Sequence, residues 1–171
     1  MKNDKEKFKN FAFIDSQNLY LSIKEDGWQL DYKRFRVYLK EKYKIEKAYM
    51  FLGYLAENQE LYKFLQEAGF ILIFKPILEK DNLPIKGNCD VDLTVYALVN
   101  NEYDKAVIIT GDGDFYALVE HLKEQGKLAR VLAPSHKNCS VLLRKAAGSD
   151  IAFISDLKQK LEYKKKSTPQ A

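Results

Sequence analysis

Apolar and polar residues alternate along this chain in a pattern that predicts strands separated by helices. Short apolar runs, typical of buried strands, lie at residues 8–15, 47–54, 70–77, 105–110 and 127–134, with a shorter run at 151–155. Amphipathic patterns with helical spacing lie at residues 16–26, 31–44, 59–69, 114–126 and 139–148. Such alternation predicts an α/β fold, with a doubly wound, mostly parallel sheet of five or six strands and helices on both faces.

Two further segments complete the predicted domain. Residues 90–101 are apolar nearly all round at helical spacing, which predicts a buried helix. Residues 78–88 are polar and contain Pro84 and Gly87, so we expect an exposed loop there. We therefore divide the chain into a polar lead at 1–10, one domain at 11–156, and a tail at 157–171 that begins helical and ends basic.

Acidic residues follow the first and fourth predicted strands. Asp15 ends the first strand, and Asp112 and Asp114 follow the fourth in the sequence TGDGD. Parallel sheets bind ligands at the carboxyl ends of their strands, near the point where the strand order reverses. If the first and fourth strands are neighbours, these three aspartates converge at one place.

A second acidic pair, Asp90 and Asp92, opens the apolar helix that leads into the fourth strand. Carboxylates gathered in one pocket repel each other, by about 4 kcal/mol for two charges about 4 Å apart at an effective dielectric constant near 20. A divalent ion relieves that repulsion, and Mg²⁺ or Mn²⁺ suits carboxylate and water ligands. Such an ion can activate a water molecule for phosphodiester cleavage. His121 and His136 lie in no acidic motif, so carboxylates are the expected ligands.

These residues also have purely structural interpretations. Asp15 and Asp90 suit helix caps, and so does Asn18. Asp112 and Asp114 suit a turn followed by a cap, although a single cap would suffice there. Both interpretations stay open at this point, and one residue can serve both roles.

Basic residues offer a path for a polyanion. Lys33, Arg36, Lys40 and Lys44 form a stripe at helical spacing within residues 31–44. A basic surface beside an acidic pocket suits a metal site that also holds a phosphate backbone. The alternative is a solvated helix face, and the formal net charge of +4 permits a nucleic-acid partner without requiring one.

Composition places the chain among globular proteins of one domain. It has 171 residues, of which 46% are hydrophobic and 30% charged. The polar start is unlike an export signal, no apolar run reaches the roughly 18 residues of a membrane span, and the two cysteines form no CxxC motif. We therefore expect a cytoplasmic protein.

Three stretches resemble the signature blocks of a known family. They are FAFIDSQNLY, KGNCDVDLTVYAL and AVIITGDGDFYALVEHLKEQGK, in the expected order between Phe11 and Asp156. They resemble the NYN domain in its LabA-like branch, within the PIN-like nuclease superfamily. The resemblance implies metal-dependent cleavage of RNA. It places the acidic ligands on Asp15, Asp90, Asp112 and Asp114, the asparagine of the first block on Asn18, and the Lys-Gly of the second on Lys86 and Gly87.

One position departs from the family pattern. Many relatives carry another acid late in the second block, where this chain has Tyr96. Asp92 is extra by comparison and is an additional candidate ligand. On a helix, however, residues two apart lie on roughly opposite faces, so Asp90 and Asp92 share a site only if Asp90 lies outside the helix proper.

Together these features predict an endoribonuclease that hydrolyses RNA with a metal-activated water and no protein nucleophile. Thr110 and Asn18 are expected to orient ligands or the phosphate, and Lys86 to meet the phosphate as a point charge. The main alternative is a module of nuclease ancestry that binds RNA or a protein partner without cutting. The sequence leaves the oligomeric state open, with a homodimer as one possibility.

Overall fold

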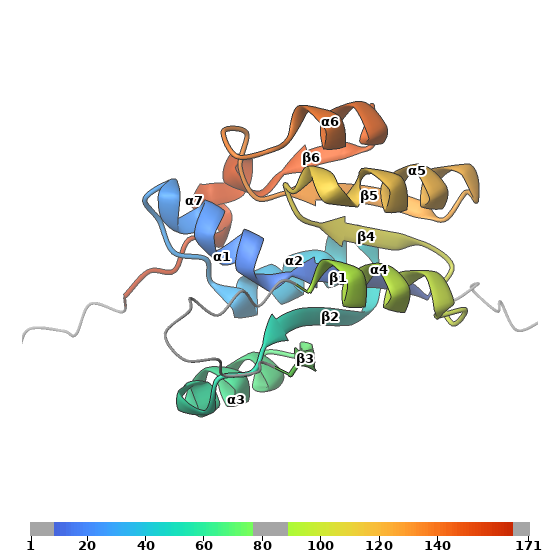
Figure 1. Cartoon of the computed structure of the whole chain (residues 1–171). Coiled ribbons are helices and arrows are strands. Elements are labelled where there is room, and N and C mark those ends of the chain that lie inside the picture. Colours follow the sequence, from blue (N-terminus) through green and yellow to red (C-terminus); the bar gives the residue numbers. More distant parts are fainter. Residues whose placement is uncertain (1–8, 77–88, 166–171) are drawn as a thin grey trace, which may run out of the picture.

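Six parallel strands form one sheet at the centre of the computed structural model, which describes residues 9–76 and 89–165 (Figure 1). They are β1 (Asn10–Asp15), β2 (Ile45–Gly53), β3 (Ile71–Lys75), β4 (Ala106–Ile109), β5 (Leu128–Ala133) and β6 (Ile151–Phe153). Their order across the sheet is β3-β2-β1-β4-β5-β6. The predicted doubly wound sheet is thus confirmed, and β6 is the edge strand expected near residue 151.

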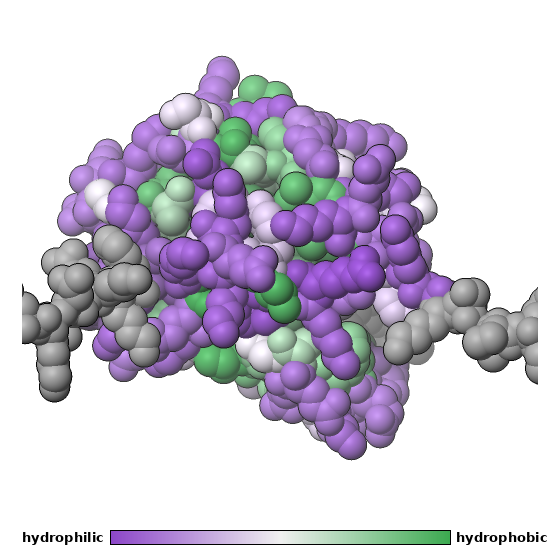
Figure 2. Space-filling view, turned by 180° about the vertical axis from the view of Figure 1, so that it is seen from behind, coloured by the Kyte–Doolittle hydropathy of each residue, from purple (hydrophilic) through white to green (hydrophobic). Residues whose placement is uncertain are grey.

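Helices cover both faces of this sheet. They are α1 (Ser16–Glu25), α2 (Tyr32–Tyr43), α3 (Gln59–Glu67), α4 (Asp90–Val99), α5 (Tyr116–Glu124), α6 (Val141–Ala147) and α7 (Lys158–Leu161), with 3-10 turns η1 (Ala56–Asn58), η2 (Gly113–Phe115) and η3 (Ile154–Leu157). Helices α4, α5 and α6 pack on one face, and α1, α2 and α7 on the other. Figure 2 shows the molecule from behind, where hydrophilic side chains predominate and smaller hydrophobic areas lie between them. In the described ranges, no helix has the length and apolar character that a membrane crossing requires.

Alternation along β1 divides the core into two clusters. Phe11 and Phe13 pack under α4, α5 and α6, whereas Ala12 and Ile14 pack under α1 and α2. Successive side chains of a strand point to opposite faces, so one strand serves both clusters. The inward positions predicted for the helix after the fourth strand, Phe115, Leu118, Val119 and Leu122, are all buried.

The order of the strands reverses between β1 and β4. Strand β1 pairs with β2 on one side and with β4 on the other, where Ile14 is paired with Ile109. The segment after β1 forms α1 on one face, and the segment after β4 forms α5 on the other. The two segments therefore diverge at the carboxyl edge, at the topological switch point whose crevice is where open α/β sheets bind ligands.

Helix α4 is less buried than its sequence predicts. Only Leu93 and Ala97 of this helix are buried, whereas Val91 is 72% exposed and Val99 is 67% exposed. The prediction of a buried helix was wrong because α4 covers the outside of the sheet and contacts it along one side only. The predicted loop at 78–88 lies outside the described residues.

Candidate metal centre

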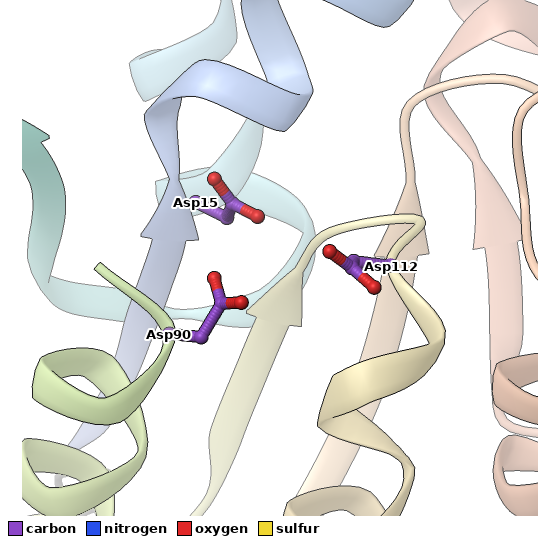
Figure 3. Close-up of side chains that lie close together, drawn as sticks. All are labelled: Asp15, Asp90 and Asp112. Carbon is purple, nitrogen blue, oxygen red and sulfur yellow. The ribbon is translucent and has the colours of Figure 1, made fainter. Parts of the chain in front are cut away.

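Three carboxylates meet at the crevice between β1 and β4. Asp15 ends β1, Asp90 is the first residue of α4, and Asp112 lies in the loop after β4. One carboxylate oxygen from each lies within 4.8 Å of the others. Figure 3 shows the three side chains converging from these separate segments. The pairing of β1 with β4 thus brings together residues that are remote in the sequence.

Asp15 is held from two sides. Its Oδ1 accepts a hydrogen bond from the backbone N–H of Asn18 at 3.1 Å, which makes Asp15 the N-cap of α1. Its Oδ2 accepts a hydrogen bond from the hydroxyl of Thr110 at 3.1 Å, and Thr110 is fully buried. Asp15 is therefore both the N-cap of α1 and a member of the group of three carboxylates.

The surroundings of Asp15 favour its protonated form. The pKa of this carboxyl is raised to about 6, chiefly by burial and also by the nearby Asp90 and Asp112, against the lowering effect of the bonds from Asn18 and Thr110. A cation placed among the three carboxylates would reverse this effect, because it stabilises their charged forms.

The TGDGD loop is fixed by hydrogen bonds to its own backbone and to α1. The backbone N–H of Asp112 donates to Thr110 Oγ1 at 3.1 Å, and Asp112 Oδ1 accepts from the N–H of Asp114 at 3.0 Å. The N–H of Gly111 donates to Asn18 Oδ1 at 2.8 Å. Asp112 therefore caps η2 and also joins the carboxylate group, whereas Asp114 is exposed and lies outside that group.

Close packing explains the two glycines of this loop. A Cβ on Gly113 would lie 2.5 Å from Ser140 Oγ, and one on Gly111 would lie 3.1 Å from the backbone oxygen of Asn138. The contacting residues belong to the loop between β5 and α6, whose Ser140 also donates its N–H to the oxygen of Gly111 at 2.9 Å. This loop was not among the site segments predicted from the sequence. The available signal was its position directly after the fifth predicted strand, which neighbours the fourth.

Asp92 does not join the three carboxylates. Its Oδ2 lies 3.6 Å from Lys75 Nζ on β3, and both side chains are partly exposed. Tyr96 packs its ring against those of Tyr49 and Phe51, with centroids 5.0 and 5.6 Å apart. At the position where many relatives carry an acid, this chain therefore has a packing residue. Asp92 faces a lysine instead of the other acids.

Cys89 is placed beside Asp90 but is poorly suited to act as a nucleophile. The side chain is buried, and this burial, with Asp92 nearby, raises the pKa of the thiol to about 11. A thiol with such a pKa is almost entirely protonated near neutral pH.

The four residues of the basic stripe have different surroundings. Arg36 donates from its guanidinium to the backbone oxygens of Gly69, Ile45 and Glu46, at 2.9, 3.3 and 2.8 Å. Lys44 ends α2 in the left-handed conformation and donates to the oxygen of Glu41 at 3.0 Å. These contacts make Arg36 a structural link between α2, the start of β2 and the turn after α3.

The stripe also runs along α2 from one end of the strands toward the other. Helix α2 ends just before β2 begins, so Lys40 and Lys44 lie toward the amino ends of the strands, away from the acids. Lys33, at the other end of α2, lies toward the carboxyl edge, with its Nζ 5.5 Å from the ring centroid of Phe64. Lys86 lies outside the described residues.

The three carboxylates suit a small divalent cation. Mg²⁺ and Mn²⁺ favour oxygen ligands, and Mg²⁺ commonly takes one or two carboxylates and completes its octahedron with water and phosphate oxygens. Asp15, Asp90 and Asp112 supply oxygens close enough to share one ion. The hydrogen bonds to Asp15 and within the loop hold two of these carboxylates in place.

Comparisons with known proteins agree with this geometry. The NYN domain model matches residues 11–155. The low amplitude and bright protein LabA of Synechococcus elongatus is 28% identical over 131 residues, which cover 65% of this chain and 66% of LabA, just under two thirds of its length. A crystal structure of a protein of unknown function from Vibrio parahaemolyticus superposes with a TM-score of 0.77 at 23% identity, over 95% of this chain and 100% of that one. Because the family match spans most of the sequence, including all three clustered aspartates, the chain belongs to the NYN domain family of the PIN-like nuclease superfamily.

Proposed function

We propose that this protein is a metal-dependent endoribonuclease. The observation that carries the proposal is the convergence of Asp15, Asp90 and Asp112, with one oxygen of each within 4.8 Å of the others, at the crevice of an NYN domain. Membership of a nuclease superfamily supports phosphodiester hydrolysis, and the resemblance to LabA-like domains supports RNA as the substrate.

Each residue of the site has a role in this proposal. Asp15, Asp90 and Asp112 hold Mg²⁺ or Mn²⁺. The bound ion supplies Lewis-acid activation of water and neutralises charge on the phosphate. Thr110 and Asn18 act through the carboxylates, because their hydrogen bonds orient Asp15 and the loop that carries Asp112. They are therefore positioning residues.

The experiment is a cleavage assay with end-labelled and circular RNA, and with DNA of the same sequences, in Mg²⁺, Mn²⁺ or chelator. We expect internal cuts in RNA with metal and none with chelator. Asp112→Asn should abolish cleavage, while its matched control Asp114→Asn should keep most of it, because Asp114 is outside the three-carboxylate group. Cleavage that persists in chelator, or an equal loss in both variants, would overturn the metal-dependent mechanism.

A second candidate function is a module that binds RNA or a protein partner without cutting. The observation that favours it is the packing of Tyr96 where many relatives carry an acid, which leaves three carboxylates in the described site. RNA binding by the wild-type protein with no cleavage in either metal would support this candidate. We also propose that the protein is cytoplasmic, which suits its two buried free cysteines. Whether two chains form a homodimer is a matter for measurement.

A further inference from the structure

An apolar cavity lies beside the acidic site. It has a volume of about 220 Å³ and lies between α1, the segment that leads into α2, the carboxyl end of β2, and α3. A cavity of about 150 Å³ already accepts a benzene ring, so this one has room for a flat heterocycle. Leu19, Met50 and Leu65 form part of its buried floor.

One lining residue of the cavity is the sequence neighbour of a proposed metal ligand. Ser16 lines it and directly follows Asp15. Met50 and Leu52, on its β2 side, belong to or pack against the core cluster under α1 and α2, whereas Asp90 begins α4 and Asp112 precedes α5, the helices on the other face. The cavity and the carboxylates therefore lie on two sides of the same carboxyl edge, and a chain crossing that edge would meet both.

The lining combines aromatic rings with polar groups. Trp28 forms a buried wall, and Tyr20, 54% exposed, stands at the rim. Lys24 also lines the cavity and places a cation at its exposed side, with its Nζ 5.7 Å from the centroid of the Tyr20 ring.

We propose that this cavity receives one unpaired nucleobase of the RNA, next to the phosphate held at the metal centre. The aromatic rings match a flat base, and Lys24 matches the backbone phosphate attached to it. An aliphatic ligand would make no use of the cation. Because a base must leave its pair and its stack to enter, the substrate is single-stranded. The inference rests on the proposed function, since it assumes that RNA crosses this edge.

Trp28 provides a direct probe, because it is the only tryptophan in the chain. Its fluorescence is followed in chelator, where no cleavage is expected, during titration with a short single-stranded RNA. The comparison ligands are the same RNA as a duplex, an abasic ribose-phosphate oligomer and nucleoside monophosphates. We expect saturable quenching by the single strand, at least about tenfold weaker binding of the abasic oligomer, and no quenching by the duplex.

Two matched variants test the position of the base. Leu61→Phe enlarges a side chain that lines the cavity, and Leu21→Phe makes the same change on α1 at a residue that does not line it. Both leucines are 44% exposed, so their effects on folding should be similarly small. We expect Leu61→Phe to weaken single-strand binding at least about tenfold and Leu21→Phe to leave it unchanged.

The outcomes separate this inference from the proposed function. Cleavage of RNA by the wild type, combined with equal affinities of the two leucine variants or of the abasic and natural oligomers, would overturn the base cavity and leave the nuclease intact. Quenching by monophosphates without quenching by RNA would also overturn it, because the ligand would then be a free nucleotide. The expected quenching pattern without any cleavage would support the cavity and reject the nuclease.

Discussion

The side chain of Asn18 accepts a hydrogen bond from the backbone N–H of Gly111, with 2.8 Å between the two atoms. Asn18 lies in the first turn of α1, and Gly111 lies in the buried part of the loop after β4. The bond therefore spans the crevice and ties the segment that carries Asp15 to the segment that carries Asp112.

Loss of this bond should weaken both the fold and the site. Asn18→Ala leaves the buried N–H of Gly111 without its partner, so we expect the free energy of unfolding to fall by about 1–3 kcal/mol, measured by urea denaturation. Mn²⁺ affinity, measured by calorimetry, should fall as well. Asn101→Ala, at an exposed position in the described structure, is the control and should change neither quantity. Equal stability of the two variants would contradict the role given to Asn18.

A divalent ion should stabilise the folded protein. The three carboxylates repel one another when charged, so Mg²⁺ or Mn²⁺ should raise the melting temperature. At a metal concentration one hundred times Kd, the gain in the free energy of unfolding is about 2.7 kcal/mol. Asp112→Asn should reduce this rise while keeping an acceptor for the N–H of Asp114. Asp114→Asn is the control. A wild-type melting temperature that does not respond to millimolar metal would remove the basis for the metal centre.

Because the pKa of Asp15 is raised, the stability of the metal-free protein should depend on pH. The pKa is 3.8 in the unfolded chain and about 6 in the folded one, so the folded state binds the proton more tightly. The stability contributed by protonated Asp15 is complete below pH 4 and is lost as pH rises through 6, about 3 kcal/mol in all. In chelator, Asp15→Asn should therefore gain stability relative to wild type between pH 4 and 7. A difference that stays constant over this range would show that the pKa of Asp15 is not raised.

The same titration should affect metal binding. Protonated Asp15 cannot act as a carboxylate ligand, so the proton and the metal compete for it. Affinity for Mn²⁺, measured by calorimetry, should fall as the pH is lowered from 7 to 5. The fall should be shallower in Asp15→Asn, whose remaining affinity is lower throughout.

Arg36 should matter for stability more than its neighbour Arg34. A lysine cannot reproduce three guanidinium bonds to Gly69, Ile45 and Glu46, so Arg36→Lys should lower the free energy of unfolding by about 2 kcal/mol. Arg34 is the matched control on the same helix. Its side chain is 49% exposed, and its Nε lies 3.5 Å from Asp31 Oδ2. Its change to lysine should cost within about 0.5 kcal/mol. Thermal or urea unfolding of both variants distinguishes these expectations.

Lys33 and Lys40 provide a test of where RNA lies on α2. Lys33 is at the carboxyl edge of the sheet and Lys40 is toward the amino edge, and both are exposed. Lys33→Glu should weaken RNA binding and flatten the plot of log affinity against log salt by roughly 0.7 per lost single-strand phosphate contact. Lys40→Glu should change neither. Identical behaviour of the two variants would mean that RNA does not follow the carboxyl edge along α2.

The sequence was sufficient to predict the parts of the fold that depend on local periodicity. The alternation of strands and helices, the inward face at Phe115 and Leu118, and the meeting of acids near β1 and β4 follow from apolar spacing and from the general behaviour of parallel sheets. Asp15 and Asp112 were identified because Asp15 ends one buried strand and Asp112 lies in the short loop after another.

Features that depend on distant partners were not predictable in the same way. The bonds of Arg36 go to backbone oxygens on β2 and after α3, and backbone acceptors leave no trace in the sequence. Val91 and Val99 are as apolar as core residues, so their exposure depends on how far the sheet extends under α4. The ion pair of Asp92 with Lys75 likewise depends on the position of the edge strand β3.

The pairing of β1 with β4 has a consequence for synthesis of the protein. A ribosome adds about 5–20 residues per second, so Asp112 is made on the order of ten seconds after Asp15. During that interval β1 lacks one of its two neighbours, and the apolar residues of its ladder, including Phe13 and Ile14, have no β4 to pair with. The proposed metal centre therefore cannot exist on a nascent chain that ends before β4. Any nucleolytic activity is withheld until most of the domain has been made, and the messenger being translated is not exposed to it earlier.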